Sequence, residues 1–166
     1  ETGKGIKRAL AAWLKEFKRS VFFRRLLALT FYTSLVLFRT LLNRKLWLNP
    51  LSDVCGGWSL WTINANGVRV LTTDSVENVL MLLPFTMLLM WAAKDKILKK
   101  VTFAGIVKSS FKTAFLFSLS VELLQLFLRV GTFQLSDLCY NTLGGIIGGV
   151  IYGAVWKIKS RKKMES

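Results

Sequence analysis

Polar and ionisable side chains gather between positions 120 and 149, within stretches that are otherwise apolar. Glu122, Gln125 and Arg129 recur at i, i+3 and i+7, which places them on one face of a helix. Asp137 and Asn141 follow at i and i+4. An ionisable side chain at the centre of a bilayer costs about 3 kcal/mol on insertion scales, so such residues usually face one another and mark a functional site. The spacing predicts two polar stripes that meet.

These residue types can bind polar groups or transfer protons. The amides of Gln125 and Asn141 can hydrogen-bond amides or sugars, and an arginine can bind phosphate or carboxylate. Glu122 and Asp137 could instead serve as an acid and a base. The sequence has no histidine, no glycine-rich phosphate loop and no cluster of cysteines, which excludes histidine-based triads and histidine metal sites. We expect no metal and no cofactor.

The composition indicates a membrane protein. Of the 166 residues, 52% are hydrophobic, although the formal net charge is +15, and the mean hydropathy is positive. The lysines and arginines cluster beside apolar runs and do not interleave with aromatic residues, so we expect no nucleic-acid partner. The chain is too apolar for an ordinary soluble basic protein.

Four apolar segments are long enough to cross about 30 Å of hydrocarbon; they cover 26–42, 76–93, 106–128 and 135–156. Before them, apolar residues such as Leu10 and Trp13 recur at helical spacing, with basic residues on the other face. This pattern is typical of an amphipathic helix on an anionic membrane surface, or of a helix packed on a partner protein. We predict an all-α membrane protein with three parts: a basic interfacial helix over 1–25, a four-helix transmembrane domain over 26–156 and a basic cytoplasmic tail over 157–166.

The distribution of basic residues predicts the orientation. Segments 1–25, 94–112 and 157–166 hold 8, 6 and 5 of the 24 lysines and arginines, all at one side of the predicted bundle. The others are Arg39, Arg44, Lys45, Arg69 and Arg129, at or near the opposite side. The positive-inside rule then places both termini in the cytoplasm and the loop 43–75 outside.

This outer loop is long enough to have its own structure. Segments 58–63 and 68–72 are β-prone, and Asn66-Gly67 between them is typical of a two-residue hairpin turn. We predict a small extracellular β-hairpin between spans one and two. Trp58 and Trp61 suit anchoring at the lipid headgroups, and the alternative is that they bind a ligand.

The two cysteines leave two alternatives open. Cys55 lies in the outer loop and Cys139 near the outer end of span four, so a disulfide is geometrically conceivable. The alternative is one free thiol and one buried small residue.

The short connection between spans three and four predicts an antiparallel helical hairpin. Pairing by depth places Arg129 beside Asp137 and Glu122 beside residues 141–143. The polar site is therefore expected in the outer half of the bilayer, open to the outside. A purely structural hydrogen-bonding role for Glu122 is the alternative.

Spans one and two add residues at the same side. Glu77 and Asn78 lie in the first turn of span two, and Arg39 lies about one turn before the outer end of span one. Arg39 is expected to approach Glu77 or Glu122, or else to extend to the headgroups.

Span four carries closely spaced glycines that let another backbone approach. They are Gly144, Gly145, Gly148, Gly149 and Gly153. Internal packing and a homodimer contact are both compatible with this spacing. In span two, Pro84 is expected to kink the helix or to leave a carbonyl free.

Several of these segments resemble the VanZ-like family, which is associated with resistance to the glycopeptide antibiotic teicoplanin. The resemblance covers the chain from the end of span one through span four. It is carried by Glu122-x-x-Gln125, Arg129, Ser136-Asp137-Leu138-x-x-Asn141-x-x-Gly144 with Gly148, the run from Asn78 to Pro84, and more weakly Leu48-Asn49-Pro50-Leu51. Thr86 departs from the family pattern, in which a glycine commonly follows the proline region.

The resemblance implies a bacterial plasma membrane and a link to lipoglycopeptide antibiotics. The favoured hypothesis is a binding or shielding protein whose outward polar site engages an outer-leaflet amphiphile: a membrane lipid, a lipid-linked cell-wall intermediate or the antibiotic itself. Its ligand-binding residues would be Glu122, Gln125, Arg129, Asp137, Asn141, Asn78 and Arg39. The alternatives are an intramembrane enzyme with Glu122 and Asp137 as acid and base, and a small proton-coupled lipid flippase.

Overall fold

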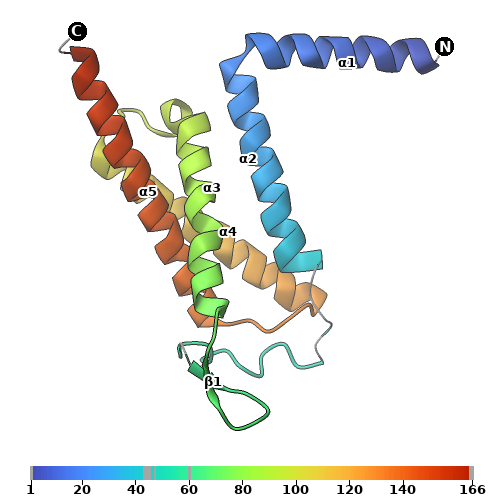
Figure 1. Ribbon diagram of the computed structural model, residues 1–166, viewed down its shortest axis with the longest axis vertical. Helices are drawn as coiled ribbons and strands as arrows, with labels where there is room; N and C mark the ends of the chain where they lie inside the picture. The colour runs from blue at the N-terminus through green and yellow to red at the C-terminus, as the bar shows by residue number, and fades with distance from the viewer. Residues whose placement is uncertain (1, 43–45, 47, 60, 165–166) are drawn as a thin grey trace.

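The computed structural model describes residues 2–42, 46, 48–59 and 61–164. Helices α2 (Val21–Leu37), α3 (Asp74–Ile97) and α5 (Leu135–Met164) run along the long axis, and α4 (Phe103–Leu128) crosses behind them obliquely (Figure 1). Both termini lie at one end of the bundle, here called the terminal end (Figure 1). Two short strands lie at the opposite end, the hairpin end. The predicted all-helical membrane class with a small hairpin is confirmed.

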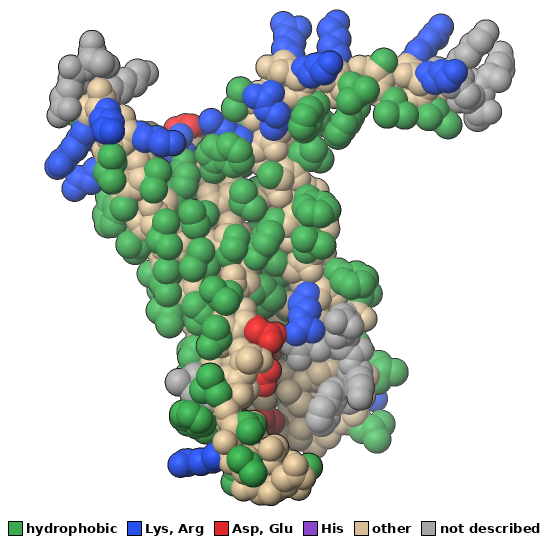
Figure 2. All heavy atoms as spheres, viewed as in Figure 1, with side chains coloured by type: hydrophobic (Ala, Val, Ile, Leu, Met, Phe, Trp, Pro, Cys, Tyr) green, Lys and Arg blue, Asp and Glu red, His purple; other side chains and the backbone are tan. Residues whose placement is uncertain are grey.

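Helix α1 (Thr2–Arg19) leaves the bundle sideways at the terminal end (Figure 1). Ser20 breaks the helix with an extended backbone and its hydroxyl oxygen accepts from the N–H of Phe23 at 3.1 Å, which caps α2. Arg24 then donates to the carbonyl oxygens of Phe17 and Lys18 at 3.0 and 3.1 Å, which holds the corner. Figure 2 shows the basic side chains of α1 on one side and its hydrophobic side chains on the other. Span one therefore begins at Val21, five residues before the predicted start.

Span one ends in a π-helical turn, η1 (Phe38–Leu42), which the apolar pattern did not predict. Thr40 of this turn is buried, and its carbonyl oxygen accepts from the Nε2 of Gln125 at 2.7 Å. A side chain of α4 thus fixes the end of span one. Single π-helical turns occur often at functional sites.

Helix α5 is the centre of the packing, with α3 and α4 both against it. Gly144 and Gly148 face α3: a Cβ on either would collide with a backbone carbonyl oxygen, that of Val79 or Leu83. Gly145 and its neighbour one turn on, Gly149, face α4, where a Cβ would collide with Ala114 or Ser110. The described structure therefore uses these glycines for internal packing, and a homodimer through them stays a prediction.

Thr86, which departs from the family pattern, lies at a close contact between α3 and α5. Its side chain is fully buried, and its Oγ1 donates to the carbonyl oxygen of Gly145 at 2.9 Å, which joins α3 to α5. Pro84 lies inside α3 without interrupting it. One turn before it, the carbonyl oxygen of Met81 accepts from the hydroxyl of Tyr32 on α2 at 2.9 Å. Contacts from both neighbouring helices thus cluster around the proline.

The predicted hairpin is present, but its turn differs from the expected one. Strands β1 (Trp61–Ile63) and β2 (Arg69–Leu71) pair antiparallel. The N–H of Asn64 donates to the carbonyl oxygen of Val68, and the N–H of Gly67 donates to that of Asn64, both at 3.0 Å. The loop between the paired residues 64 and 68 therefore has three residues, 65–67, rather than two. Gly67 has φ +76°, a left-handed conformation that glycine adopts without strain. The predicted first strand includes residue 60, which lies outside the described residues.

Residues 50–58, here called the roof segment, bond to the beginning of α5 and the connection before it. The N–H groups of Phe133 and Leu135 donate to the carbonyl oxygens of Pro50 and Val54, at 2.9 and 3.0 Å. The hydroxyl of Tyr140 donates to the carbonyl oxygen of Trp58 at 3.1 Å. The described roof segment is therefore attached to span four, although it follows span one in the sequence.

Candidate functional site

A polar cleft lies at the hairpin end, between α3, η1 and the beginning of α5. Its central cavity has a volume of about 190 Å³ and is lined by Arg39, Asp74, Glu77, Asn78, Gln134 and Asp137. A cavity of about 260 Å³ extends from it beneath the hairpin and the roof segment, and shares Asp74, Gln134 and Asp137 as walls. A third, of about 130 Å³, shares Arg39, Glu77 and Asn78 and reaches Met81. The three cavities have common walls, and we refer to them together as the polar cleft.

Asn78 and Asp137 form the floor of this cleft. The Nδ2 of Asn78 donates to the Oδ1 of Asp137 at 2.7 Å and joins the first turns of α3 and α5. Asn78 is 9% exposed, so its amide lies at the boundary between the cleft and the packed helices. Both residues were predicted to belong to one site, but a direct bond between them was not, since depth pairing matched Asp137 with Arg129.

Arg39 and Glu77 form the side of the cleft that faces α2. The Nη2 of Arg39 lies 2.8 Å from the Oε2 of Glu77, and their side chains are 60% and 50% exposed. The other oxygen of Glu77 accepts from the hydroxyl of Thr73 at 2.9 Å. The expected approach of Arg39 to Glu77 is confirmed. A pair this exposed contributes little to stability, about 0–1 kcal/mol, because water competes for both charges.

Glu122 lies beneath the cleft rather than in it. Its side chain is 2% exposed, and its Oε2 accepts from the backbone N–H of Gln134 at 3.3 Å. The side chain of Gln134 lines the cleft and donates from Nε2 to the Oδ2 of Asp53 in the roof segment at 2.6 Å. Gln134 therefore connects the buried carboxylate, the cleft and the roof segment.

Gln125 and Asn141 are also buried below the cleft, and each bonds to a different helix. Gln125 bonds to Thr40 on η1, and the Nδ2 of Asn141 donates to the Oγ of Ser118 on α4 at 3.1 Å. Within the described residues the Oδ1 of Asn141 has no hydrogen-bond partner. Burying an amide oxygen without a partner costs about 1–3 kcal/mol, so such an atom needs an explanation.

The predicted depth pairing of spans three and four was wrong. Asn141 contacts Ser118, a full turn deeper than expected, and Glu122 contacts Gln134, before α5 begins. The reason is the connection between the helices. It does not make a tight turn; its described part bonds to Leu46 through Val130 and to the roof segment, while α4 crosses α5 obliquely (Figure 1).

Arg129 is not brought into the site. It ends α4 with φ 54°, a left-handed conformation, and its side chain is exposed. The ion pairs between described residues are Arg39 with Glu77 and Lys94 with Asp95, so the expected Arg129–Asp137 pair is absent among them. A left-handed residue is a common end of a helix, and here it ends α4 at the residue before the connection to α5. Arg44 and Lys45, also predicted at this side, lie outside the described residues.

The cleft includes residues that the sequence analysis did not select. Asp74 and Gln134 line it, and Asp53 borders it from the roof segment. Their signal was weak: each is an ordinary polar residue at the start of a helix, just before one or in a loop. Both cysteines are free and exposed, so the structure has neither the disulfide nor the buried cysteine of the two alternatives. No three described His, Cys, Asp or Glu side chains are grouped so as to hold a metal ion.

The fold and the cleft define the class of the protein. Four helices, Val21–Leu42, Asp74–Ile97, Phe103–Leu128 and Leu135–Lys162, are long and apolar enough to cross a membrane. Figure 2 shows a hydrophobic belt between two polar ends, which is the surface of a small multi-pass membrane protein.

A family model described as VanZ/LLP1 matches residues 17–157. The chain therefore belongs to the VanZ/LLP1 family, as its motifs indicated. No curated protein and no solved structure matches it.

Proposed function

We propose that this chain is a bacterial plasma-membrane protein that binds an outer-leaflet amphiphile in the polar cleft and thereby contributes to teicoplanin resistance. The observation that carries the proposal is the position of the cleft, at the margin of the hydrophobic belt (Figure 2). A polar headgroup at this depth meets the floor residues Asn78 and Asp137, while an attached acyl chain stays beside the spans. Membership of the VanZ/LLP1 family supports the link to teicoplanin.

The chemistry of the cleft suits a headgroup rich in amides or hydroxyls. Carboxylates of Asp74 and Asp137 offer acceptors, and the amides of Asn78 and Gln134 offer both donors and acceptors. Arg39, held by an exposed and weak ion pair, can exchange Glu77 for a ligand phosphate or carboxylate. A lipid-linked cell-wall intermediate and the lipoglycopeptide itself both present such groups.

The positions of Glu122 and Asp137 support ligand binding rather than a reaction in which these two residues act as acid and base. Asp137 lines the cleft, but Glu122 lies below it, with Gln134 between the carboxylate and the cavity. A general acid must come within hydrogen-bond reach of its substrate. A proton-coupled flippase would also need a path to the terminal end, whereas the described polar cavities lie at the hairpin end.

The proposal requires the hairpin end to face outward. The basic residues of α1, the α3–α4 connection and the end of α5 lie at the terminal end (Figure 2), which the positive-inside rule places in the cytoplasm. With Cys55 and Cys139 replaced by serine, Asn66→Cys should react with a membrane-impermeant maleimide in intact cells. Lys162→Cys should react only after permeabilisation. The opposite labelling pattern would overturn the orientation and the proposed ligand leaflet.

Resistance measurements test the function itself. Asn78→Ala removes a floor amide of the cleft and Asn141→Ala removes the buried amide beneath it. The loss of a hydrogen bond from Asn78 to a charged ligand group, about 1.5–3 kcal/mol, weakens binding about tenfold or more, whereas Asn141→Ala acts through the packing beneath the cleft floor. The minimum inhibitory concentration of teicoplanin should fall toward that of cells without the protein. That of vancomycin, which lacks an acyl chain, should change little, because apolar burial of about 0.8 kcal/mol per CH₂ supplies the selectivity.

Asn66→Ala, at the exposed tip of the hairpin loop, is the matched control. It makes the same substitution outside the cleft and should leave both inhibitory concentrations unchanged. Immunoblots of membrane fractions establish equal abundance for all variants. Equal loss of resistance to both drugs, or full resistance with Asn78→Ala at normal abundance, would refute the proposed function.

A further inference from the structure

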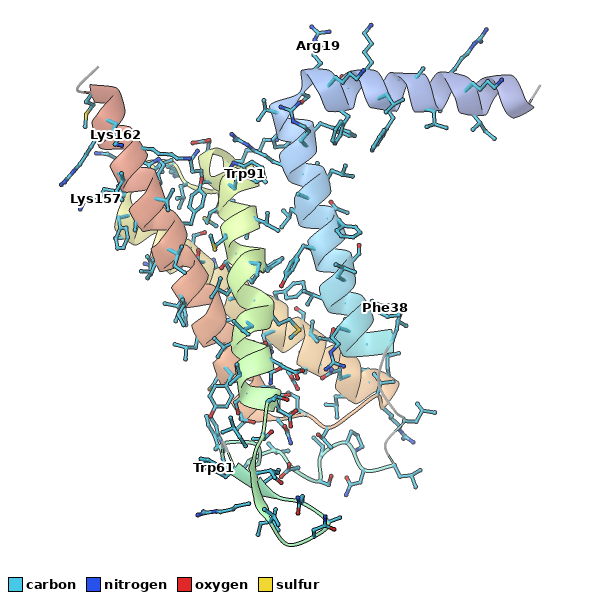
Figure 3. The ribbon with its side chains drawn as sticks, viewed as in Figure 1. Arg19, Phe38, Trp61, Trp91, Lys157 and Lys162 are labelled. Carbon is cyan, nitrogen blue, oxygen red and sulfur yellow. The ribbon has the colours of Figure 1, made fainter. Side chains whose placement is uncertain are left out.

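A second groove lies at the terminal end, between the beginning of α4 and the last turns of α5. It has a volume of about 330 Å³ and is lined by Phe103, Ala154, Lys157, Ile158 and Arg161. None of these residues lines the polar cleft, which lies at the other end of the molecule. Figure 3 shows Lys157 near the C-terminal end of α5, in the turns closest to the terminal end.

The shape of the groove follows from two small residues of α5. Gly153 leaves room for the ring of Phe103, since a Cβ at this position would lie 2.8 Å from the Cδ2 of that ring. Ala154, the next residue, has a side chain too short to fill the space beside it. The ring of Phe103 and the exposed side chain of Ile158 then form apolar walls. These apolar walls lie in the last turns of the fourth candidate span, Leu135–Lys162.

The charges around the groove all favour an anion. Lys157 and Arg161 are four residues apart, on one face of α5, and no carboxylate lines the groove. Within the described residues neither cation forms an ion pair. Phe103 is the first residue of α4, so the groove also borders the positive end of a 26-residue helix. Thr102 caps that helix by accepting from the N–H of Gly105 at 3.0 Å, which fixes where it begins.

We propose that this groove is a binding site for an anionic phospholipid of the leaflet at the terminal end. The lipid phosphate lies between Lys157 and Arg161, and one acyl chain lies over Phe103, Ala154 and Ile158. Basic pockets between transmembrane helices bind anionic headgroups in this way, because the cations and the apolar walls recognise the two halves of the same molecule. A zwitterionic lipid fills the apolar part equally well but has no net charge for the two cations.

Native mass spectrometry of the purified full-length protein in detergent tests the site. The protein is titrated with phosphatidylglycerol and, separately, with phosphatidylcholine of the same acyl chains. The unaltered chain should bind the first phosphatidylglycerol more tightly than phosphatidylcholine. In the double variant Lys157→Gln/Arg161→Gln, the affinity for phosphatidylglycerol should fall at least about tenfold, since each basic residue near an anionic lipid contributes about 1 kcal/mol. Affinity for phosphatidylcholine should change less than twofold.

Two further variants separate a built site from general charge attraction. Lys99→Gln/Lys100→Gln removes the same charge from the α3–α4 connection at the same end and should keep phosphatidylglycerol binding within twofold. Ala154→Phe fills the groove, keeps both cations and should reduce phosphatidylglycerol binding as strongly as the double glutamine variant. Equal losses in the two double variants, or unchanged binding with Ala154→Phe in folded protein, would overturn the proposal. If the double glutamine variant does not fold, Lys157→Gln alone and Ala154→Phe decide the outcome.

Discussion

Gly144→Ala should push α3 away from α5 and steeply lower the temperature at which the protein unfolds. The new Cβ would collide with the carbonyl oxygen of Val79, and a backbone atom inside a helix cannot rotate away as a side chain can. Gly148→Ala creates the same collision one turn deeper, at Leu83. Overpacking of a tight contact costs about 1–3 kcal/mol and occasionally more. Both changes together should leave little protein folded, since the helices must move apart along their whole contact.

The control for this prediction is Gly5→Ala. Gly5 lies in α1, and a Cβ there would meet nothing within 4 Å. The same substitution at this position should be neutral or slightly stabilising, because alanine favours helix over glycine by about 1 kcal/mol. Fluorescence-detected size-exclusion chromatography after heating, with all variants in one detergent, provides the comparison. A Gly144→Ala protein with the heat resistance of Gly5→Ala would show that the α3–α5 contact is not as close as described.

Asn78→Asp should be strongly destabilising, whereas its combination with Asp137→Asn should recover part of the loss. The single change places two carboxylates where a 2.7 Å hydrogen bond now joins an amide to a carboxylate. Like charges at this distance oppose one another, and the expected loss is a few kcal/mol of unfolding free energy at neutral pH. The double variant exchanges donor and acceptor and restores one carboxylate facing one amide.

A double-mutant cycle measures this coupling. The resistance to heat and the inhibitory concentration of teicoplanin are determined for both single variants and for the double variant. Recovery is expected to be partial, since Asp137 also lines the cleft and takes part in other interactions. Asp74→Asn is a matched control, because it also neutralises a carboxylate of the cleft. Its effect on heat resistance should be the same whether residue 78 is Asn or Asp. A double variant no better than the sum of its single variants would exclude the Asn78–Asp137 bond as a structural element.

Features that depend on local patterns were predictable from the sequence. The four spans follow from the lengths of the apolar segments alone, because every helix that crosses a bilayer needs the same minimum apolar length. Close helix packing follows from the glycines of α5, although their spacing did not tell an internal contact from a dimer contact. The pairing of Arg39 with Glu77 was predictable because both residues lie near the same end of adjacent spans.

Features that depend on the path of the chain were not predictable. The short connection after Arg129 indicated an antiparallel hairpin, but a connection's length does not determine the angle at which two helices cross. The left-handed Arg129 and the oblique α4 moved Glu122 and Asn141 to different partners. The π-helical turn η1 has no sequence signature of its own. Gln134 was missed because its position depends on the roof segment, which is more than seventy residues away in the sequence.

The bonds between the roof segment and the beginning of α5 determine which parts of the protein open together. Amides of Phe133 and Leu135 are held by carbonyls of residues 50 and 54, and Tyr140 holds residue 58. Groups that protect one another in this way exchange their amide hydrogens as one cooperative unit, whatever their separation along the chain. We therefore expect the roof segment and the first turn of span four to open as one foldon, so that the cleft beneath them widens when both loosen together.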